Sequence, residues 1–228
     1  MSDNHYLSVG DAAEKLGVIP ARIRALIGVG ALDAEKIGNR WLISRSSVEQ
    51  RLKGRHPTGR SFTPEHSWAL LLYASGADHI ISELSSPEQS RLRQWLHRAS
   101  IMELAPRLRA RAETSQLRGH SSDIAALTEE KAIVLGGVSV ASICHFDIVA
   151  PGVVEFYASP TTMHHLTQKY FLEKSVNPNV IAHVVKVSWP FLPDDRAVPC
   201  LVAALDLLEA NDERTRRAGL TYLQNQGR

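Results

Sequence analysis

Two arginines near the start of the chain have a side-chain type and a spacing that suit contact with nucleic acid. Arg22 and Arg24 follow Pro20, which fits the first position of a helix because its missing N–H is not needed there. In such a helix Ile23 faces a core, while the two arginines and Ala21 point outward. The guanidinium group offers a planar fork of donors that matches guanine O6 and N7 or a phosphate. The alternative is that both arginines are plain solvated charges.

A second set of residues, in the middle of the chain, matches part of a motif for chemistry with two metal ions. Gly136-Gly137 is followed by Asp147, which is half of a nucleotidyltransferase signature. That chemistry needs two carboxylates at positions i and i+2 of one strand, so that both point at the same ions. The second position is Val149, and Glu155 belongs to a different predicted element. We therefore expect no active transferase, but an enzyme of this class remains an alternative.

The other candidate groups form no catalytic or metal-binding pattern. His164-His165 would splay by about 100° on a helix, and Cys144-His145 lacks the second pair of ligands that a zinc site needs. Asp194-Asp195 lies in a predicted loop, where it suits a turn or a helix cap. Ser139 and Ser142 have no His and Asp partners at a telling spacing. We expect no catalytic residue, no metal ligand and no cofactor.

The elements before the two arginines are predicted to form the first half of a helix-turn-helix. Ser8 is a helix-cap candidate with Asp11 three residues later, a variant of the capping box. Apolar residues then recur at helical spacing as far as Leu16. Gly17 can adopt the left-handed turn that ends such a helix. The helix that begins at Pro20 is the second helix of this motif.

A predicted hairpin and a third helix follow. Residues 35–43 contain two β-prone runs on either side of Gly38-Asn39, which is a hairpin signal. Ser44 or Ser46 would cap the next helix. The order helix, turn, helix, hairpin, helix is typical of a winged DNA-binding domain whose second helix lies in the major groove. We predict such a domain over residues 1–54.

This stretch resembles the excisionase/MerR-type helix-turn-helix. The resemblance implies that Ala21, Arg22 and Arg24 lie on DNA and that Arg40 contacts it at the tip of the wing. Pro20 departs from the family, which more often has Ser or Thr at this position and can bond a phosphate there. The matching residues are Ser8-Val9 with Ala12-Ala13, Leu16-Gly17-Val18, Arg22 to Ile27, Gly30-Ala31-Leu32 and residues 37–43.

The chain after the winged domain is first basic and then helical. Residues 55–62 contain Gly and Pro without apolar periodicity and are predicted to be a linker. Its Arg55 and Arg60 would follow the DNA backbone or enter a minor groove, or they would belong to a solvated hinge. Residues 63–117 are predicted to be a helical connector, with helix starts at Pro64 and near Pro87.

Arginines recur along the predicted connector. Its second helix carries three of them away from its apolar face, and a further helical piece over residues 102–112 carries three more. The last three have i, i+2, i+4 spacing and do not share one helical face, so they are either solvated charges or a second phosphate-binding surface. The arginines are Arg91, Arg93 and Arg98, then Arg107, Arg109 and Arg111.

Residues 118–228 are predicted to form a mixed α and β domain. Two convincing strands alternate apolar and polar residues, and a shorter apolar run precedes a Gly-rich turn and a small-residue helix. No internal repeat and no low-complexity tract is present. The predicted strands are 153–158 and 180–187, with 132–135 either a buried strand or the start of a helix. The predicted helices are 159–170, 198–210 and 212–224, and residues 136–143 are predicted to be a Gly-rich turn that leads into a helix.

Charge and cysteine content give further expectations. Residues 1–118 carry 17 Lys and Arg against 12 Asp and Glu, whereas residues 119–228 carry 9 against 12, so the front is basic and the rear acidic. No apolar run is long enough to span a membrane, and the start of the chain has no signal pattern, so we expect a cytoplasmic protein. In that compartment Cys144 and Cys200 are expected to be buried free thiols, with a disulfide between them as the alternative.

The rear part resembles the antitoxin half of abortive-infection (AbiEi-type, type IV) toxin–antitoxin regulators. The resemblance implies a winged front that represses its own operon and a rear domain that opposes a nucleotidyltransferase-like toxin, and it transfers no catalytic residue. The matching residues are Gly137 to Ala141, Asp147 to Gly152, Val154 to Tyr157, Asn179-Val180, Pro199 to Leu208, Asp212-Glu213-Arg214 and Arg217-Ala218-Gly219.

The sequence as a whole predicts an α+β protein with a DNA-binding front. We expect a bacterial transcriptional regulator that acts by binding, as the autorepressing antitoxin of its operon. Its partners would be double-stranded operator DNA and a cognate toxin protein, with no membrane contact. Operators are usually inverted repeats, so a homodimer or tandem binding is expected. The alternatives are a nucleic-acid-processing or nucleotidyltransferase-like enzyme delivered to DNA by its front, and a ligand-sensing regulator.

Overall fold

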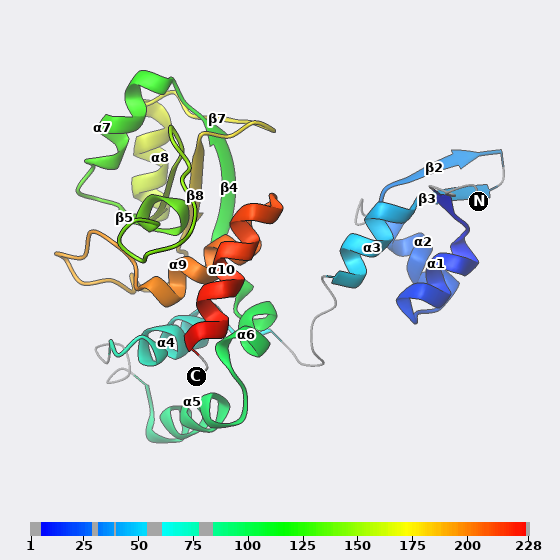
Figure 1. Cartoon of the computed structure of the whole chain (residues 1–228), viewed down its shortest axis with the longest axis horizontal. Helices are drawn as coiled ribbons and strands as arrows, with labels where there is room; N and C mark the ends of the chain where they lie inside the picture. The colour runs from blue at the N-terminus through cyan, green and yellow to red at the C-terminus, as the bar shows by residue number, and fades with distance from the viewer. Residues whose placement is uncertain (1–5, 29–31, 39, 54–60, 78–83, 227–228) are drawn as a thin grey trace. The chain divides into compact units, whose positions relative to one another are not determined.

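The computed structural model describes residues 6–28, 32–38, 40–53, 61–77 and 84–226, which form two compact units (Figure 1). The first unit is Met1–Pro57 and the second is Thr58–Arg228. Helices and sheets occur in both units, which confirms the α+β prediction. None of the described helices is long and apolar enough to cross a membrane. Because the two units are separate bodies, each is described by itself.

The first unit contains the predicted helix, turn, helix, hairpin and helix. Ser8 caps its first helix as expected, since its hydroxyl accepts the Asp11 N–H at 3.1 Å and the Asp11 carboxylate accepts the Ser8 N–H at 3.2 Å. Gly17 ends that helix in the left-handed conformation, with φ of 56°. The elements are β1 (Tyr6–Leu7), α1 (Val9–Leu16), α2 (Pro20–Gly28), β2 (Ala34–Ile37), β3 (Arg40–Ser44) and α3 (Arg45–Lys53).

The three strands of the first unit form one antiparallel sheet in the order β1-β3-β2. The hairpin pairs Ala34 with Ile43 and Ile37 with Arg40, so the predicted hairpin is confirmed. A single small core joins the helices to this sheet. Its buried residues are Leu7, Ala12, Ala13, Leu16, Ile23, Leu26, Leu32, Ile43 and Val48.

The second unit is built on a five-stranded sheet in the order β5-β6-β8-β4-β7, in which β6 and β8 are parallel and the other pairs are antiparallel. The strands are β4 (Glu113–Arg118), β5 (Val134–Leu135), β6 (Val154–Ala158), β7 (Glu173–Lys174) and β8 (Val180–Val184). The helices are α4 (Pro64–Ala74), α5 (Ser86–Arg98), α6 (Ile101–Leu104), α7 (Ile124–Thr128), α8 (Pro160–Lys169), α9 (Cys200–Glu209) and α10 (Glu213–Gln226).

Side chains alternate between the two faces of this sheet along each strand, and each face packs against a separate hydrophobic core. Phe156 and Ala182 belong to a core shared with α7 and α8 on one face (Figure 1). Tyr157 on the opposite face belongs to the larger core, which contains α4, α9 and α10. Phe156 and Tyr157 are consecutive residues of β6, so their side chains point to opposite faces and belong to different cores.

The segment predicted as a connector packs in the larger core and belongs to the second unit. On α4 Trp68 is 1% exposed, and its ring lies edge-to-face with Tyr157 of β6 at 5.3 Å. Its Nε1 donates to the main-chain oxygen of Arg111 at 2.9 Å. Residues 113–118 are not connector either, because they form β4, which lies between β8 and β7 in the sheet.

Three predicted elements differ from the structure. The helix expected over 102–112 ends as α6 at Leu104, and two 3₁₀ turns follow, η2 (Ala105–Arg107) and η3 (Arg109–Arg111). Pro106 explains this break, because it has no N–H to continue an α-helix. Residues 137–140 form a 3₁₀ turn, η5 (Gly137–Val140), rather than the start of a helix, and the strand expected to reach residue 187 ends at Val184.

The prediction of free thiols was wrong. Cys144 and Cys200 form a disulfide, with their Cα atoms 5.4 Å apart. The turn η5 packs on α9, and this contact brings the two cysteines together across 56 residues of sequence. Such a long-range approach leaves no local sequence signal.

A buried arginine fastens the connector segment to α9. Arg111 is 2% exposed, and its guanidinium contacts Asp206 at 2.7 Å and Glu209 at 2.8 Å. Burial lowers the pKa of Arg111, but Tyr157, Glu209 and Asp206 together raise it by more than burial lowers it, so the group stays charged. The idea that Arg111 is a solvated charge or a phosphate contact is therefore wrong.

We predict that Arg111→Met lowers the free energy of unfolding by about 3–5 kcal/mol, because it leaves Asp206 as an unpaired buried charge. Urea unfolding followed by circular dichroism measures this loss. Lys186→Met is the control: it removes an exposed pair with Glu113 and should cost at most about 1 kcal/mol. Equal losses in the two variants would contradict the role given to Arg111.

Candidate functional site

The second helix of the first unit presents the predicted arginines to solvent. Ile23 is fully buried and Leu26 is 5% exposed, so this side of α2 faces the core. Ala21, Arg22 and Arg24 lie on the exposed side. Within the described part of the chain neither arginine side chain has a hydrogen bond or an ion pair, so both guanidinium groups are available to an external acceptor.

The hairpin adds two further cations. Arg40 is exposed at the start of β3, where the sequence placed the wing contact. Lys36 on β2 is also exposed, and its ammonium lies 6.0 Å from the ring centroid of Trp41, its partner across the hairpin. Sequence reasoning missed Lys36, although the alternation of side chains along β2 could have indicated that it is exposed. Arg55 and Arg60 lie outside the described residues.

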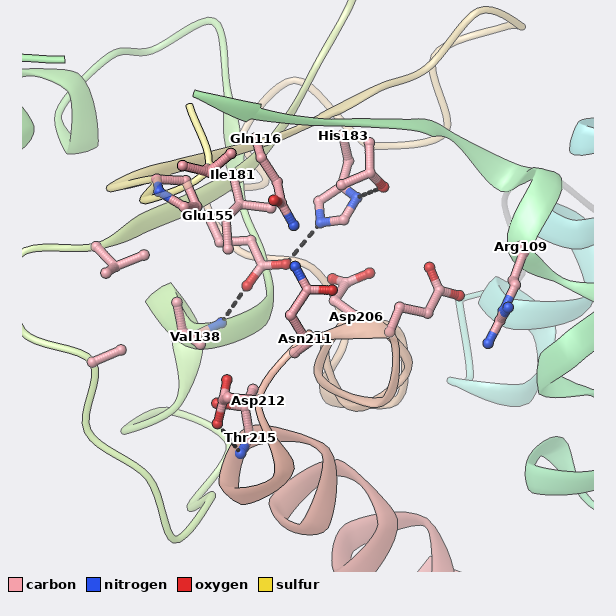
Figure 2. A pocket seen from close by; sticks show the side chains of 17 residues that line it. Arg109, Gln116, Val138, Glu155, Ile181, His183, Asp206, Asn211, Asp212 and Thr215 are labelled. Atoms are coloured by element: carbon pink, nitrogen blue, oxygen red, sulfur yellow. Dashed lines mark hydrogen bonds and ion pairs between the residues drawn. The ribbon is translucent and has the colours of Figure 1, made fainter. Parts of the chain in front are cut away.

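The second unit contains a pocket of about 610 Å³ on the face of the sheet opposite α7 and α8 (Figure 2). Its floor is polar, and its wall includes the exposed side chain of Val176. A ligand-sensing regulator needs such a cavity. The lining residues are Arg109, Thr114, Gln116, Val138, Ala150, Val153, Glu155, Val176, Pro178, Ile181, His183, Asp206, Glu209, Ala210, Asn211, Asp212 and Thr215.

The buried acids at the floor are held by protein donors. Glu155 accepts from His183 Nε2 at 2.8 Å and from the Val138 N–H at 2.9 Å (Figure 2). Asp206 accepts from the Tyr157 hydroxyl at 2.5 Å and from the Gly137 N–H at 3.2 Å, in addition to Arg111. Burial raises the pKa of Tyr157, which keeps its hydroxyl neutral and able to donate.

Glu155, His183 and Asp206 each offer a possible metal ligand, and these three atoms lie within 4.8 Å of one another. Their present bonds work against this use. Burial lowers the pKa of His183, but Asp206 and the hydrogen bond with Glu155 raise it further, above 6.5. Both ring nitrogens of His183 already have protein partners, Nε2 with Glu155 and Nδ1 with the Thr114 hydroxyl at 3.0 Å. We therefore assign the cluster to the packing of β6, β8 and α9.

The Gly136-Gly137 motif has a structural explanation. Gly137 has φ of 43°, and a Cβ atom there would lie 1.8 Å from a Glu155 carboxylate oxygen. A Cβ atom on Gly136 would lie 2.9 Å from the Tyr157 ring. The two glycines let the main chain approach the buried acids closely. Asp147, the other half of the signature, is exposed in the loop after η5, whereas Glu155 is buried on β6.

Comparison with known families identifies the first unit. Residues 6–56 match the model of a helix-turn-helix domain family, which covers about a fifth of the chain. The first unit is a helix-turn-helix domain. This domain indicates a DNA-binding regulator, and α2 is its second helix. Searches of curated proteins and of solved structures gave no significant match.

Outside the helix-turn-helix domain, the residues that sequence reasoning missed are the buried polar ones. Glu155, His183 and Asp206 all lie within otherwise apolar strands or helices, and this is the signal that could have found them. A charged residue in such a run needs a buried partner. The sequence does not say which partner, because Arg111 is 95 residues away from Asp206.

We predict that the stabilising effect of His183 depends on pH. A raised pKa in the folded state means that its contribution is complete below about pH 6.5 and is lost as the pH rises through the raised value. The difference in unfolding free energy between the wild type and His183→Gln should therefore shrink with rising pH, by up to about 1.4 kcal/mol per pH unit. Urea unfolding between pH 6 and pH 9 measures it.

His164→Gln is the control for this experiment, because His164 is exposed on α8. It should leave the stability nearly unchanged at every pH. A constant difference for His183→Gln over the whole range would show that the imidazole is not stabilised in its charged form.

Proposed function

We propose that the chain is a sequence-specific transcriptional regulator that reads a DNA duplex with α2 of its helix-turn-helix domain. The exposure of Arg22 and Arg24, on a helix whose other side forms the core, is the observation that supports this most directly. Their guanidinium groups would bond guanine edges in the major groove. Arg40 and Lys36 would contact the flanking backbone from the wing.

The proposal includes two protomers, or two copies bound in tandem, on each operator. Helix-turn-helix proteins reach adequate affinity by engaging two half-sites about one helical turn apart. One helix-turn-helix domain is small, with nine buried core residues, and presents only one short helix, α2, to the DNA. An inverted repeat in the promoter of the chain's own operon is the expected target.

We propose further that the second unit acts by binding rather than by catalysis, as the antitoxin of a toxin–antitoxin pair. The resemblance of residues 118–223 to AbiEi-type antitoxins supports this role. The bonding of Glu155 and Asp206 agrees with it, because both carboxylates accept hydrogen bonds from protein groups and are not free to activate a substrate. The partner would be a nucleotidyltransferase-like toxin.

We predict that Arg22→Ala weakens binding to the chain's own promoter by about 1–3 kcal/mol while changing affinity for random duplex much less, because a base contact is lost. Fluorescence anisotropy with both duplexes at one salt concentration measures the two affinities. Arg51→Ala removes another exposed arginine, from α3 of the same domain, and serves as the control. Equal loss on both duplexes would show that Arg22 contacts the backbone and reads no base.

The antitoxin role is tested by co-expression with the product of the adjacent reading frame. Growth should stop when that product is made alone and recover when the full chain is present. Recovery should persist in Arg22→Ala, because neutralisation depends on the second unit. Continued toxicity in the presence of wild-type chain would reject the antitoxin role and leave the DNA-binding proposal intact.

A further inference from the structure

Helix α5 of the second unit carries a group of exposed arginines, which we name the α5 basic face: Arg91, Arg93 and Arg98. None of the three has a hydrogen bond or an ion pair within the described residues. Leu92 on the same helix is 2% exposed and fixes which side of α5 meets the core. The arginines therefore remain on the solvent side.

The helical positions spread these charges over a broad surface. Arg91 and Arg98 are seven residues apart, so they lie on one side of the helix about 10 Å apart along its axis. Arg93 lies on the other flank of the exposed arc, one turn before the exposed His97. Arg91 and Arg98 share one side of α5 and Arg93 lies on the opposite flank, so the three form a broad basic surface, which suits an extended polyanion better than it suits a single small anion.

The one carboxylate of α5 is engaged at the start of the helix, and of the three arginines it is Arg91 whose charge acts on it. Glu88 lies at the start of the helix, where it accepts from the N–H and hydroxyl of Ser85 at 3.0 and 2.6 Å. It also lies 3.7 Å from His66 of α4. The side chain of Ser85 lowers the pKa of Glu88, in agreement with this capping role. From Gln89 to Arg98 the helix has no acid.

An aromatic group adjoins the arginines. Trp95 on α5 is 36% exposed, and Phe62 packs edge-to-face on it at 5.5 Å between ring centroids. The guanidinium of Arg107 lies 4.2 Å from the Trp95 centroid and 4.1 Å from that of Phe62. This stack fixes the start of the second unit beside α5, since Phe62 also donates its N–H to the Arg107 oxygen at 3.0 Å.

We propose that the α5 basic face is a second, sequence-independent contact with the backbone of the DNA that the helix-turn-helix domain binds. The inference rests on the proposed function of that domain. Because both surfaces belong to one chain, binding by the first unit raises the effective concentration of the duplex near the second. Arginine contacts with phosphate then add affinity without reading bases.

The charge pattern favours DNA over an acidic protein segment as the partner. A duplex presents a dense row of phosphates, and each neutralised phosphate releases counterions. The chain already carries a domain that brings it to DNA. An acidic segment of a protein partner is the competing occupant, and it would leave DNA affinity independent of α5.

The test compares the full-length wild type with the triple variant Arg91→Gln, Arg93→Gln and Arg98→Gln, which keeps good helix formers on α5. Affinities for the promoter duplex and a random duplex are measured by anisotropy across a salt series. The slope of log affinity against log salt should fall by about one for each arginine that contacts a phosphate. Between about 50 and 200 mM salt, wild-type affinity should then drop up to about fortyfold more than that of the variant.

A second triple variant controls for net charge. Lys131→Gln, Arg214→Gln and Arg217→Gln remove three exposed cations from other parts of the second unit and should leave the salt slope unchanged. Circular dichroism and thermal unfolding confirm that all variants fold. The α5 variant must lose affinity equally on both duplexes and keep the wild-type preference for the promoter.

Each result has a definite meaning. An unchanged salt slope in the α5 variant, with normal promoter binding by wild type, overturns this inference and leaves the proposed function in place. An equal effect of the control variant also overturns it, because the loss would then follow from net charge alone. Failure of wild type to bind either duplex rejects the proposed function and this inference together.

Discussion

The second unit depends on the burial of one positive charge. A guanidinium group cannot lose its proton inside a protein, so Arg111 is stable there only with carboxylates at hydrogen-bond distance. Asp206 and Glu209 supply them from α9, and Trp68 of α4 holds the main chain of Arg111 from the other side. One residue thereby joins α4, η3 and α9: its main chain contacts α4 and its side chain contacts α9.

The same constraint explains why the middle of the sheet is polar. Asp206 balances Arg111 and needs further donors, which the Tyr157 hydroxyl and the Gly137 N–H provide. Glu155 and His183 form a second pair beside it, and the His183 ring stacks on Tyr157 at 4.7 Å. A residue larger than glycine at position 137 would collide with Glu155. A glycine pair that matches part of an enzyme signature is thus required by packing.

Local signals in the sequence predicted local structure well. Ser8, Gly17 and the periodic apolar residues around them predicted the helix-turn-helix, because caps and amphipathic spacing act within a few residues. The two main strands were predicted for the same reason. The disulfide and the burial of Arg111 were not, since each depends on contacts across 56 and 95 residues or more, which leave no trace in spacing. The sequence did not predict that the connector packs into the second unit. The apolar residues of α4 predict a helix with a buried face, but they do not indicate which elements bury it.

The two groups of arginines in residues 63–117 show that backbone geometry determines whether an arginine side chain is exposed or buried. Arg91, Arg93 and Arg98 lie on a regular helix anchored by Leu92, so each points away from the core. The later three follow Pro106, where the chain turns in 3₁₀ steps and directs its side chains differently. Arg107 stacks on aromatic rings, Arg109 is exposed and Arg111 is buried. Charge composition is the same in both groups, and only the fold separates a surface that can meet a polyanion from a charge that holds the protein together.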